Sequence, residues 1–290
     1  MRKKKNQEVE IHLTDFCPHN CVFCSVKKHV KPEPKFKEIE KKLKLIKRFR
    51  KLVLSGGEPL LRKDLIEIIQ SIKKHQKNIC LETNAIYLNN KKIRELISAG
   101  LTEFKISFHS SNKKEYESIV RKKGSFSKII KVFKILRVYQ NKIKISTNTV
   151  ITKYNKNSLE KTIKYLEKNF PYIVEMRISY PRFYRIKNKQ NYSKKYLVSL
   201  PKIRKELDKV SKLNNPKIIL ENMPLCVVKN AFTKKINWEI FLIKKGKLSK
   251  GCEGRKFLNI CKKCHKKKNC QGIHKYYGLY FNENFVKPFN

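Results

Sequence analysis

Three thiols stand close together near the start of the chain, in the run Cys17-Pro-His-Asn-Cys21-Val-Phe-Cys24. Cysteine thiolates are soft ligands that suit zinc and iron–sulfur clusters. A closed zinc site needs four ligands, and His19 or His29 could serve as the fourth ligand of a zinc knuckle. A [4Fe–4S] cluster on the three thiols alone would leave one iron open to a substrate or cofactor.

A second motif lies about 30 residues downstream, where Leu54-Ser55-Gly56-Gly57-Glu58-Pro59 ends an apolar run. The chain has only 9 glycines among 290 residues, so a glycine pair is informative. It predicts that the backbone approaches another group closely at this point. Exposed backbone groups here could hold a small polar ligand, such as the ammonium or carboxylate of an amino acid.

Five of the nine cysteines lie in the C-terminal part of the chain: Cys226, Cys252, Cys261, Cys264 and Cys270. Four thiolates suffice for one [4Fe–4S] cluster, and either Cys226 or Cys252 could join the other three. The competing interpretation is a zinc site of three cysteines and His274, because Cys264-x5-Cys270-x3-His274 has suitable spacing. The surrounding lysines and tyrosines would suit RNA binding.

Hydrophobic periodicity predicts the elements that must position these motifs. Strands are expected at 9–13, 51–55, 79–83, 103–108, 143–151 and 173–179. Helices are expected at 36–49, 63–74, 91–99, 126–139 and 157–168, with Ser158 as an N-cap and Gly100 as a C-cap. A further helix is expected at about 201–213.

Strands that alternate with helices of this length predict an α/β fold, a partial (β/α)6 TIM-like barrel with a small cysteine-rich C-terminal extension. In such folds the chemistry gathers at the carboxyl ends of the strands. The expected divisions are a core at 1–185, a basic connector and helix at 186–213, and the extension at 214–290.

The charge balance is extreme: 70 basic against 23 acidic residues give a formal net charge of +47. Such a charge is typical of nucleic-acid binders, but lysine, isoleucine and asparagine share A/T-rich codons, and arginine is scarce. We therefore expect salt-sensitive, nonspecific RNA binding and take genome composition as the simpler cause. No apolar run is long enough for a membrane helix or a signal peptide, so a cytoplasmic protein is expected, and its cysteines are expected to be thiols rather than disulfides.

Together, the Cys-x3-Cys-x2-Cys run and the Gly-Gly-Glu-Pro turn resemble motifs of the radical S-adenosylmethionine (SAM) superfamily over roughly residues 8 to 180. The resemblance implies an enzyme that cleaves SAM at a [4Fe–4S] cluster and abstracts hydrogen from its substrate with the resulting 5′-deoxyadenosyl radical. It also implies an electron donor such as a flavodoxin or ferredoxin. No catalytic side chain is expected beyond the cluster and SAM.

The resemblance also implies site residues. Cys17, Cys21 and Cys24 would hold the cluster. The expected SAM contacts are Phe23, Gly56, Gly57, Glu58, Thr83, Asn84, Ser107 and Asn148. Cys226, Cys261, Cys264 and Cys270, with Cys252 as a further candidate, resemble the auxiliary-cluster extensions of the SPASM and twitch type, although His274 stands where SPASM expects a cysteine. Cys80 is interpreted as a small buried apolar residue and His109 as a surface or hydrogen-bonded residue.

Several functions remain open at this stage. The leading hypothesis is a radical SAM enzyme with one auxiliary cluster, acting on a peptide, a cofactor precursor or another small molecule. The alternatives are an RNA-modifying radical SAM enzyme and a noncatalytic zinc or iron–sulfur protein that binds RNA. Only about eight residues precede the first predicted strand, so no leader-binding domain is expected there.

Overall fold

The computed structural model describes residues 7–24, 35–43, 49–181, 196–228, 239–244, 247–250, 255–270 and 272–289. Within these residues, nine strands form one sheet in the order β7-β6-β5-β4-β3-β2-β1-β8-β9. Neighbouring strands from β1 to β7 are parallel, β8 runs parallel to β1, and β9 returns antiparallel to β8. This strand order, with a helix after most strands, is the architecture of a partial TIM-like barrel.

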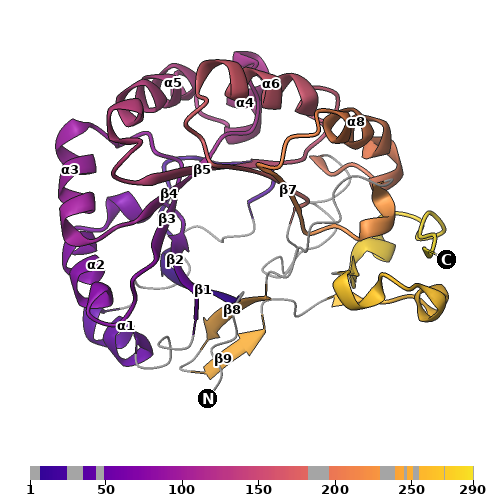
Figure 1. Ribbon diagram of the computed structural model, residues 1–290, viewed down its shortest axis with the longest axis horizontal. Coiled ribbons are helices and arrows are strands. Elements are labelled where there is room, and N and C mark those ends of the chain that lie inside the picture. The colour runs from indigo at the N-terminus through magenta and orange to yellow at the C-terminus, as the bar shows by residue number, and fades with distance from the viewer. Residues whose placement is uncertain are drawn as a thin grey trace.

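The parallel strands are β1 (Gln7–Thr14), β2 (Lys51–Gly56), β3 (Ile79–Thr83), β4 (Glu103–Ser107), β5 (Lys144–Val150), β6 (Glu175–Ser179), β7 (Ile218–Glu221) and β8 (Glu239–Lys244), and β9 spans Lys247–Lys250. The helices are α1 (Phe36–Leu43), α2 (Leu65–Lys73), α3 (Asn90–Ala99), α4 (Lys113–Val120), α5 (Ser125–Leu136), α6 (Leu159–Asn169) and α8 (Leu200–Lys212). They lie in an arc around the outer face of the sheet (Figure 1).

Each helix turns an apolar stripe toward the sheet, which explains why periodicity predicted most of them. In α5 the stripe of Ile129, Val132, Phe133 and Leu136 is buried. The six strands expected from the sequence are confirmed, with ends that shift by no more than two residues. None of the described helices is both long enough and apolar enough to cross a membrane.

Helix α4 was not expected from the sequence. Its apolar face consists of only Tyr116, Ile119 and Val120, which is too short a stripe to stand out among charged residues. Its start is nevertheless well defined, because the side chain of Asn112 accepts a hydrogen bond from the backbone N–H of Glu115 at 3.1 Å.

The two expected helix caps have different outcomes. Gly100 ends α3 with a left-handed φ of 112°, which confirms the predicted C-cap. Ser158 occupies the N-cap position of α6, but its side chain does not cap the helix. Its hydroxyl instead donates a hydrogen bond to the carboxylate of Glu115 at 2.6 Å, so it ties α6 to α4.

The C-terminal part contributes to the same sheet, because β7 pairs with β6 and β8 pairs with β1. The sheet therefore continues past the expected core boundary at residue 185. The cysteine-rich segment adds a short antiparallel pair, β10 (Arg255–Lys256) and β11 (Ile273–His274), and single 3-10 turns at its cysteines: η3 (Leu225–Val227), η4 (Asn259–Lys263) and η5 (Lys267–Asn269).

Buried charges fill the amino end of the barrel. Lys51 Nζ lies 2.9 Å from the carboxylate of Glu8 and 2.8 Å from that of Glu103, and all three residues lie at or near the starts of their strands. Burial disfavours charge on Glu103, but the ammonium of Lys51 outweighs it and lowers the pKa of that carboxyl. This paired cluster leaves the carboxyl ends of the strands as the place for a ligand pocket.

Candidate active site and a second cysteine pocket

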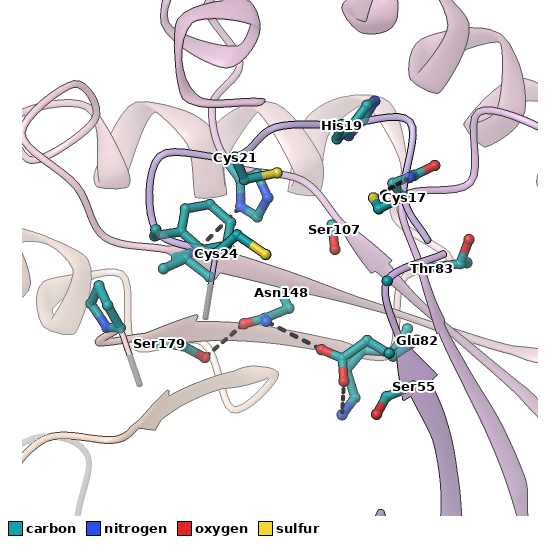
Figure 2. Close-up of a pocket in the computed structure, with 18 of the residues that line it drawn as sticks. Cys17, His19, Cys21, Cys24, Ser55, Glu82, Thr83, Ser107, Asn148 and Ser179 are labelled. Carbon is teal, nitrogen blue, oxygen red and sulfur yellow. Dashed lines mark hydrogen bonds and ion pairs between the residues drawn. The ribbon is translucent and has the colours of Figure 1, made fainter. Parts of the chain in front are cut away.

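One pocket opens at the carboxyl ends of the strands, and the cysteine triplet forms part of its wall (Figure 2). The expected site residues that line it are Cys17, Cys21, Phe23, Cys24, Gly56, Gly57, Thr83, Asn84, Ser107 and Asn148. These residues come from the ends of β1 to β5, so the fold gathers them from more than 130 positions of sequence. Their roles toward a ligand stay predictions.

Helix α4 holds the cysteine loop in place. The backbone N–H of Asn20 donates to the carbonyl of Val120 at 3.0 Å, and that of Val22 donates to the carbonyl of Ile119 at 2.9 Å. The side chain of Val22 is buried, and the N–H of Cys24 closes a turn onto the carbonyl of Cys21 at 3.1 Å. These bonds fix the backbone on both sides of Cys21 while all three thiols remain partly exposed.

The donor set suits a cluster better than a single ion. No three His, Cys, Asp or Glu side chains in the described ranges are arranged to hold one metal ion. His19 lines the pocket without completing such a group, and His29 lies outside the described residues. Three soft thiols facing one open pocket fit the larger [4Fe–4S] cluster, which needs more widely spaced sulfurs.

Burial raises the pKa of the Cys17 thiol to about 11, and the nearby carboxyl of Glu58 adds to this rise. The side-chain amide of Asn84 lies 3.7 Å from the Cys17 sulfur and opposes it. Without a bound cation this thiol therefore keeps its proton at neutral pH. Binding a metal cluster there must release that proton.

The double glycine packs against the cysteine loop. The N–H of Gly57 donates to the carbonyl of Thr14, and the N–H of Glu58 donates to the carbonyl of Phe16, each at 2.6 Å. A Cβ on Gly57 would lie 2.0 Å from the Phe16 carbonyl oxygen, and one on Gly56 would lie 2.4 Å from that of Thr14. The expected close approach of the backbone is present, and its partner is the loop that carries Cys17.

Glu58 departs from the expectation that it contacts SAM. Its side chain is completely buried and does not line the pocket. The carboxylate accepts hydrogen bonds from the Thr83 hydroxyl at 2.6 Å and from the N–H groups of Asn84 and Leu60 at 2.8 and 3.1 Å. Burial outweighs these bonds and raises its pKa to about 7. Glu58 therefore joins the ends of β2 and β3 behind the pocket wall.

A polar row crosses the pocket below the cysteines (Figure 2). The Ser179 hydroxyl donates to the Asn148 side-chain oxygen at 2.6 Å, and the Asn148 amide donates to Glu82 at 3.5 Å. Lys105 lies 3.9 Å from Glu82. Burial disfavours charge on Lys105, but attraction to Glu82 outweighs it and raises the pKa of the ammonium. The row offers donors and acceptors to a polar ligand.

Sequence reasoning missed several residues that line this pocket: Glu10, His12, Glu82, Lys105, His109, Ser179 and Glu221. The period of two in a strand could have found some of them, because Lys105 lies two positions before Ser107 on the same face of β4. His109 is buried, whereas the sequence favoured a surface or hydrogen-bonded residue. Burial, together with nearby His19, lowers the pKa of His109 to about 3.

A second pocket brings together Cys226, Cys261, Cys264 and Cys270. Backbone N–H groups of Leu225 and Gly272 lie 3.4 and 3.3 Å from the Cys270 sulfur, and that of Phe289 lies 3.4 Å from the Cys264 sulfur. Such N–H groups stabilise sulfur that carries negative charge, as the ligands of an iron–sulfur cluster do. Burial raises the pKa of the Cys226 thiol to about 11.

The other candidate ligands of this second site do not join it. His274 is buried in β11, where its Nδ1 accepts a hydrogen bond from the N–H of Tyr276 at 3.2 Å, and it does not line the pocket. Cys252 lies outside the described residues. Cys80 is buried in β3, away from both pockets, as its apolar surroundings predicted.

A short segment connects the two pockets. Glu221 and Asn222 line the first pocket, and the chain from Pro224 to Cys226 lines the second. The Arg255 guanidinium donates to the backbone carbonyl of Asn222 at 3.0 Å, to its side-chain oxygen at 2.8 Å and to the carbonyl of Gly272 at 3.5 Å. One side chain thus fixes the segment between the pockets against the cysteine-rich part.

Comparisons with known proteins agree with this geometry. The profile of the Radical SAM superfamily matches residues 11–166. A GTP 3′,8-cyclase of Clostridium perfringens is 31% identical over 182 residues, which cover 58% of this chain and 55% of the relative. A GTP 3′,8-cyclase of Aquifex aeolicus is 36% identical over 159 residues, 50% of this chain and 48% of the relative. The chain thus spans about half the length of these relatives.

Solved structures share the fold. SuiB of Streptococcus suis bound to S-adenosylmethionine superposes with a TM-score of 0.65 at 13% identity, over 98% of this chain and 76% of SuiB. The enzyme anSMEcpe with bound AdoMet superposes with a TM-score of 0.57 at 19% identity, over 74% of this chain and 63% of that one. At these identities the likeness concerns the fold.

Proposed function

This chain belongs to the radical SAM superfamily of enzymes, whose profile covers more than half of it and whose members use a [4Fe–4S] cluster and SAM, and on that premise we propose that Cys17, Cys21 and Cys24 hold the cluster. The observation that supports this assignment is the shared pocket: the only three thiols that line it stand beside polar groups suited to the amino-acid part of SAM. When bound, the cluster supplies the electron that cleaves SAM to methionine and a 5′-deoxyadenosyl radical.

The residues of the chain position the reactants. The Gly56–Gly57 turn packs under the cysteine loop and exposes backbone to the pocket, where it suits the ammonium of SAM. Ser107 and Asn148 present a hydroxyl and an amide that suit its carboxylate or ribose. The pocket wall excludes bulk water around a reactive intermediate, which is the usual contribution of a protein to cofactor chemistry. No side-chain acid or base is required.

We further propose that Cys226, Cys261, Cys264 and Cys270 hold one auxiliary [4Fe–4S] cluster. Their shared pocket and the N–H groups directed at two of the sulfurs support it, and the position of His274 away from that pocket disfavours the zinc alternative. The noncatalytic RNA-binding alternative is not favoured, because the chain belongs to an enzyme superfamily.

Metal analysis tests both cluster assignments. Protein purified and reconstituted without oxygen is expected to contain about eight irons, two [4Fe–4S] clusters, and no zinc. Replacing Cys17, Cys21 or Cys24 with Ala should abolish SAM cleavage and leave about four irons. Persistent cleavage in these variants would refute the active-site assignment. About four irons plus one zinc in the wild type would refute the auxiliary cluster alone.

For the substrate we propose a guanine nucleotide, GTP, because the relatives that match the barrel are named GTP 3′,8-cyclases. Glu82 and Glu221 line the pocket, and carboxylates repel phosphates. The nucleoside part of GTP should therefore face the pocket floor, with the triphosphate directed outward.

Isotope transfer tests this substrate. A bond between C3′ and C8 requires loss of the hydrogen at C3′, so deuterium from C3′ of GTP should appear in 5′-deoxyadenosine when GTP, SAM and dithionite are mixed without oxygen. GTP should also accelerate methionine release, whereas ATP, the matched control nucleotide, should not. SAM cleavage that ignores GTP would refute this substrate while retaining the SAM chemistry, and peptides would become the next class to test.

A further inference from the structure

His109 is held in a fixed orientation at the wall of the SAM pocket. It follows β4 by two residues and is 1% exposed. Its ring meets the edge of Phe23 with a centroid distance of 4.8 Å and stacks on Tyr116 at 6.1 Å. The Asn155 amide holds its backbone carbonyl at 2.7 Å. These contacts leave the imidazole little freedom to turn.

The hydrogen bonding also fixes the tautomer. The backbone N–H of Val150 lies 3.2 Å from Nδ1 of His109, and a backbone N–H can only donate. Nδ1 must therefore present a lone pair, and the neutral ring carries its hydrogen on Nε2. Within the described part of the chain, no group accepts a hydrogen bond from Nε2. The ring lines the pocket, so this N–H is available to a ligand there.

The chemistry of the wall indicates which part of the ligand faces this donor. Phe23, His109 and Val150 make one end of the pocket aromatic and apolar, while Gly56, Gly57 and other polar groups make another end suited to an amino acid. Aromatic side chains provide surfaces on which flat heterocyclic bases stack. Adenine is the flat part of SAM, and its ring nitrogens accept hydrogen bonds.

We propose that His109 is a specificity-determining residue whose Nε2–H donates a hydrogen bond to a ring nitrogen of the SAM adenine. The inference rests on the proposed function, namely that this pocket binds SAM. Val150 has a positioning role, because its N–H selects the tautomer that makes His109 a donor rather than an acceptor.

Two variants separate the donor from the fold around it. In His109→Asn, the Oδ1 atom can still accept from the Val150 N–H, but no group reaches the position of Nε2. In His109→Gln, the longer amide can return a donor near that position. His75→Asn serves as the matched control, because His75 is exposed at the end of α2, outside the pocket.

Anaerobic calorimetry of the reconstituted enzyme should measure three ligands separately: SAM, 5′-deoxyadenosine and methionine. His109→Asn should weaken SAM and 5′-deoxyadenosine about tenfold, ~1.4 kcal/mol, and leave methionine unchanged. His109→Gln should recover most of the loss, and His75→Asn should change nothing. Equal losses for methionine, or unchanged 5′-deoxyadenosine affinity, would overturn the proposal.

Base analogues test the same bond in the wild-type enzyme. One of 1-deaza-, 3-deaza- and 7-deaza-5′-deoxyadenosine should bind about tenfold more weakly than 5′-deoxyadenosine, and that analogue should lose nothing further in His109→Asn. Wild-type affinities that are equal for all four compounds would refute the hydrogen bond. Failure of SAM itself to bind the wild type would refute the proposed function instead, so the two failures are distinguishable.

Discussion

Replacing Gly57 with Ala should displace the cysteine loop. The new Cβ would lie 2.0 Å from the carbonyl oxygen of Phe16 and 2.6 Å from its carbonyl carbon, distances that no relaxed structure can keep. The obstruction is backbone rather than a flexible side chain, so either β2 or the loop that carries Cys17 must move. Both 2.6 Å hydrogen bonds between them, from Gly57 to Thr14 and from Glu58 to Phe16, would lengthen or break.

The expected cost follows from these two bonds and the local strain. Each backbone hydrogen bond contributes roughly 1 kcal/mol, and overpacking a tight contact costs about 1–3 kcal/mol. We therefore expect Gly57→Ala to lower the free energy of unfolding by ~3 kcal/mol. Gly124→Ala is the matched control: its Cβ would meet nothing within 4 Å, and only its left-handed φ of 74° adds strain of about 1 kcal/mol.

Thermal unfolding of the two apoproteins and iron content after reconstitution measure these effects. Gly57→Ala should unfold at a clearly lower temperature than Gly124→Ala, should retain less iron in the first pocket, and should bind SAM more weakly. If both variants have equal stability and full iron content, the reasoning is refuted, and the glycine pair serves something other than close packing against the cysteine loop.

Three further predictions test other parts of the structure. Because the pKa of Glu58 is raised to about 7 in the fold, its ionisation opposes folding, so stability should fall as pH rises from about 4.5 to 7; Glu58→Gln should remove this dependence in urea unfolding curves, and a wild-type stability that is flat over the same range would contradict it. Cys226→Ala should lose the distal iron whereas Cys80→Ala, at a buried site outside both pockets, should keep all of it, and equal iron contents would refute the ligand role of Cys226. Arg255→Lys cannot reproduce the forked contacts to Asn222 and should speed hydrogen exchange in residues 272–289, an effect whose absence would show that Arg255 does not fix this segment.

Local patterns predicted much of the fold because their causes are local. Alternating and helical apolar spacing located six strands and most of the helices, since each element buries one face against the same sheet. Helix α4 escaped because three apolar residues give too weak a pattern. Its loss from the prediction concealed the support of the cysteine loop, which depends on hydrogen bonds to Ile119 and Val120.

The sequence by itself determined the cysteine triplet, the glycine turn and the strand order that brings them together, because short spacings and periodicity are written into neighbouring residues. Only the tertiary structure decided that the Glu58 carboxylate turns away from the pocket, that Glu82, Lys105 and His109 line it, and that Cys226 joins the distal cysteines. These outcomes depend on burial and on contacts between residues far apart in the chain. The direction of a side chain and its partners are set by packing, and residue spacing carries no record of them.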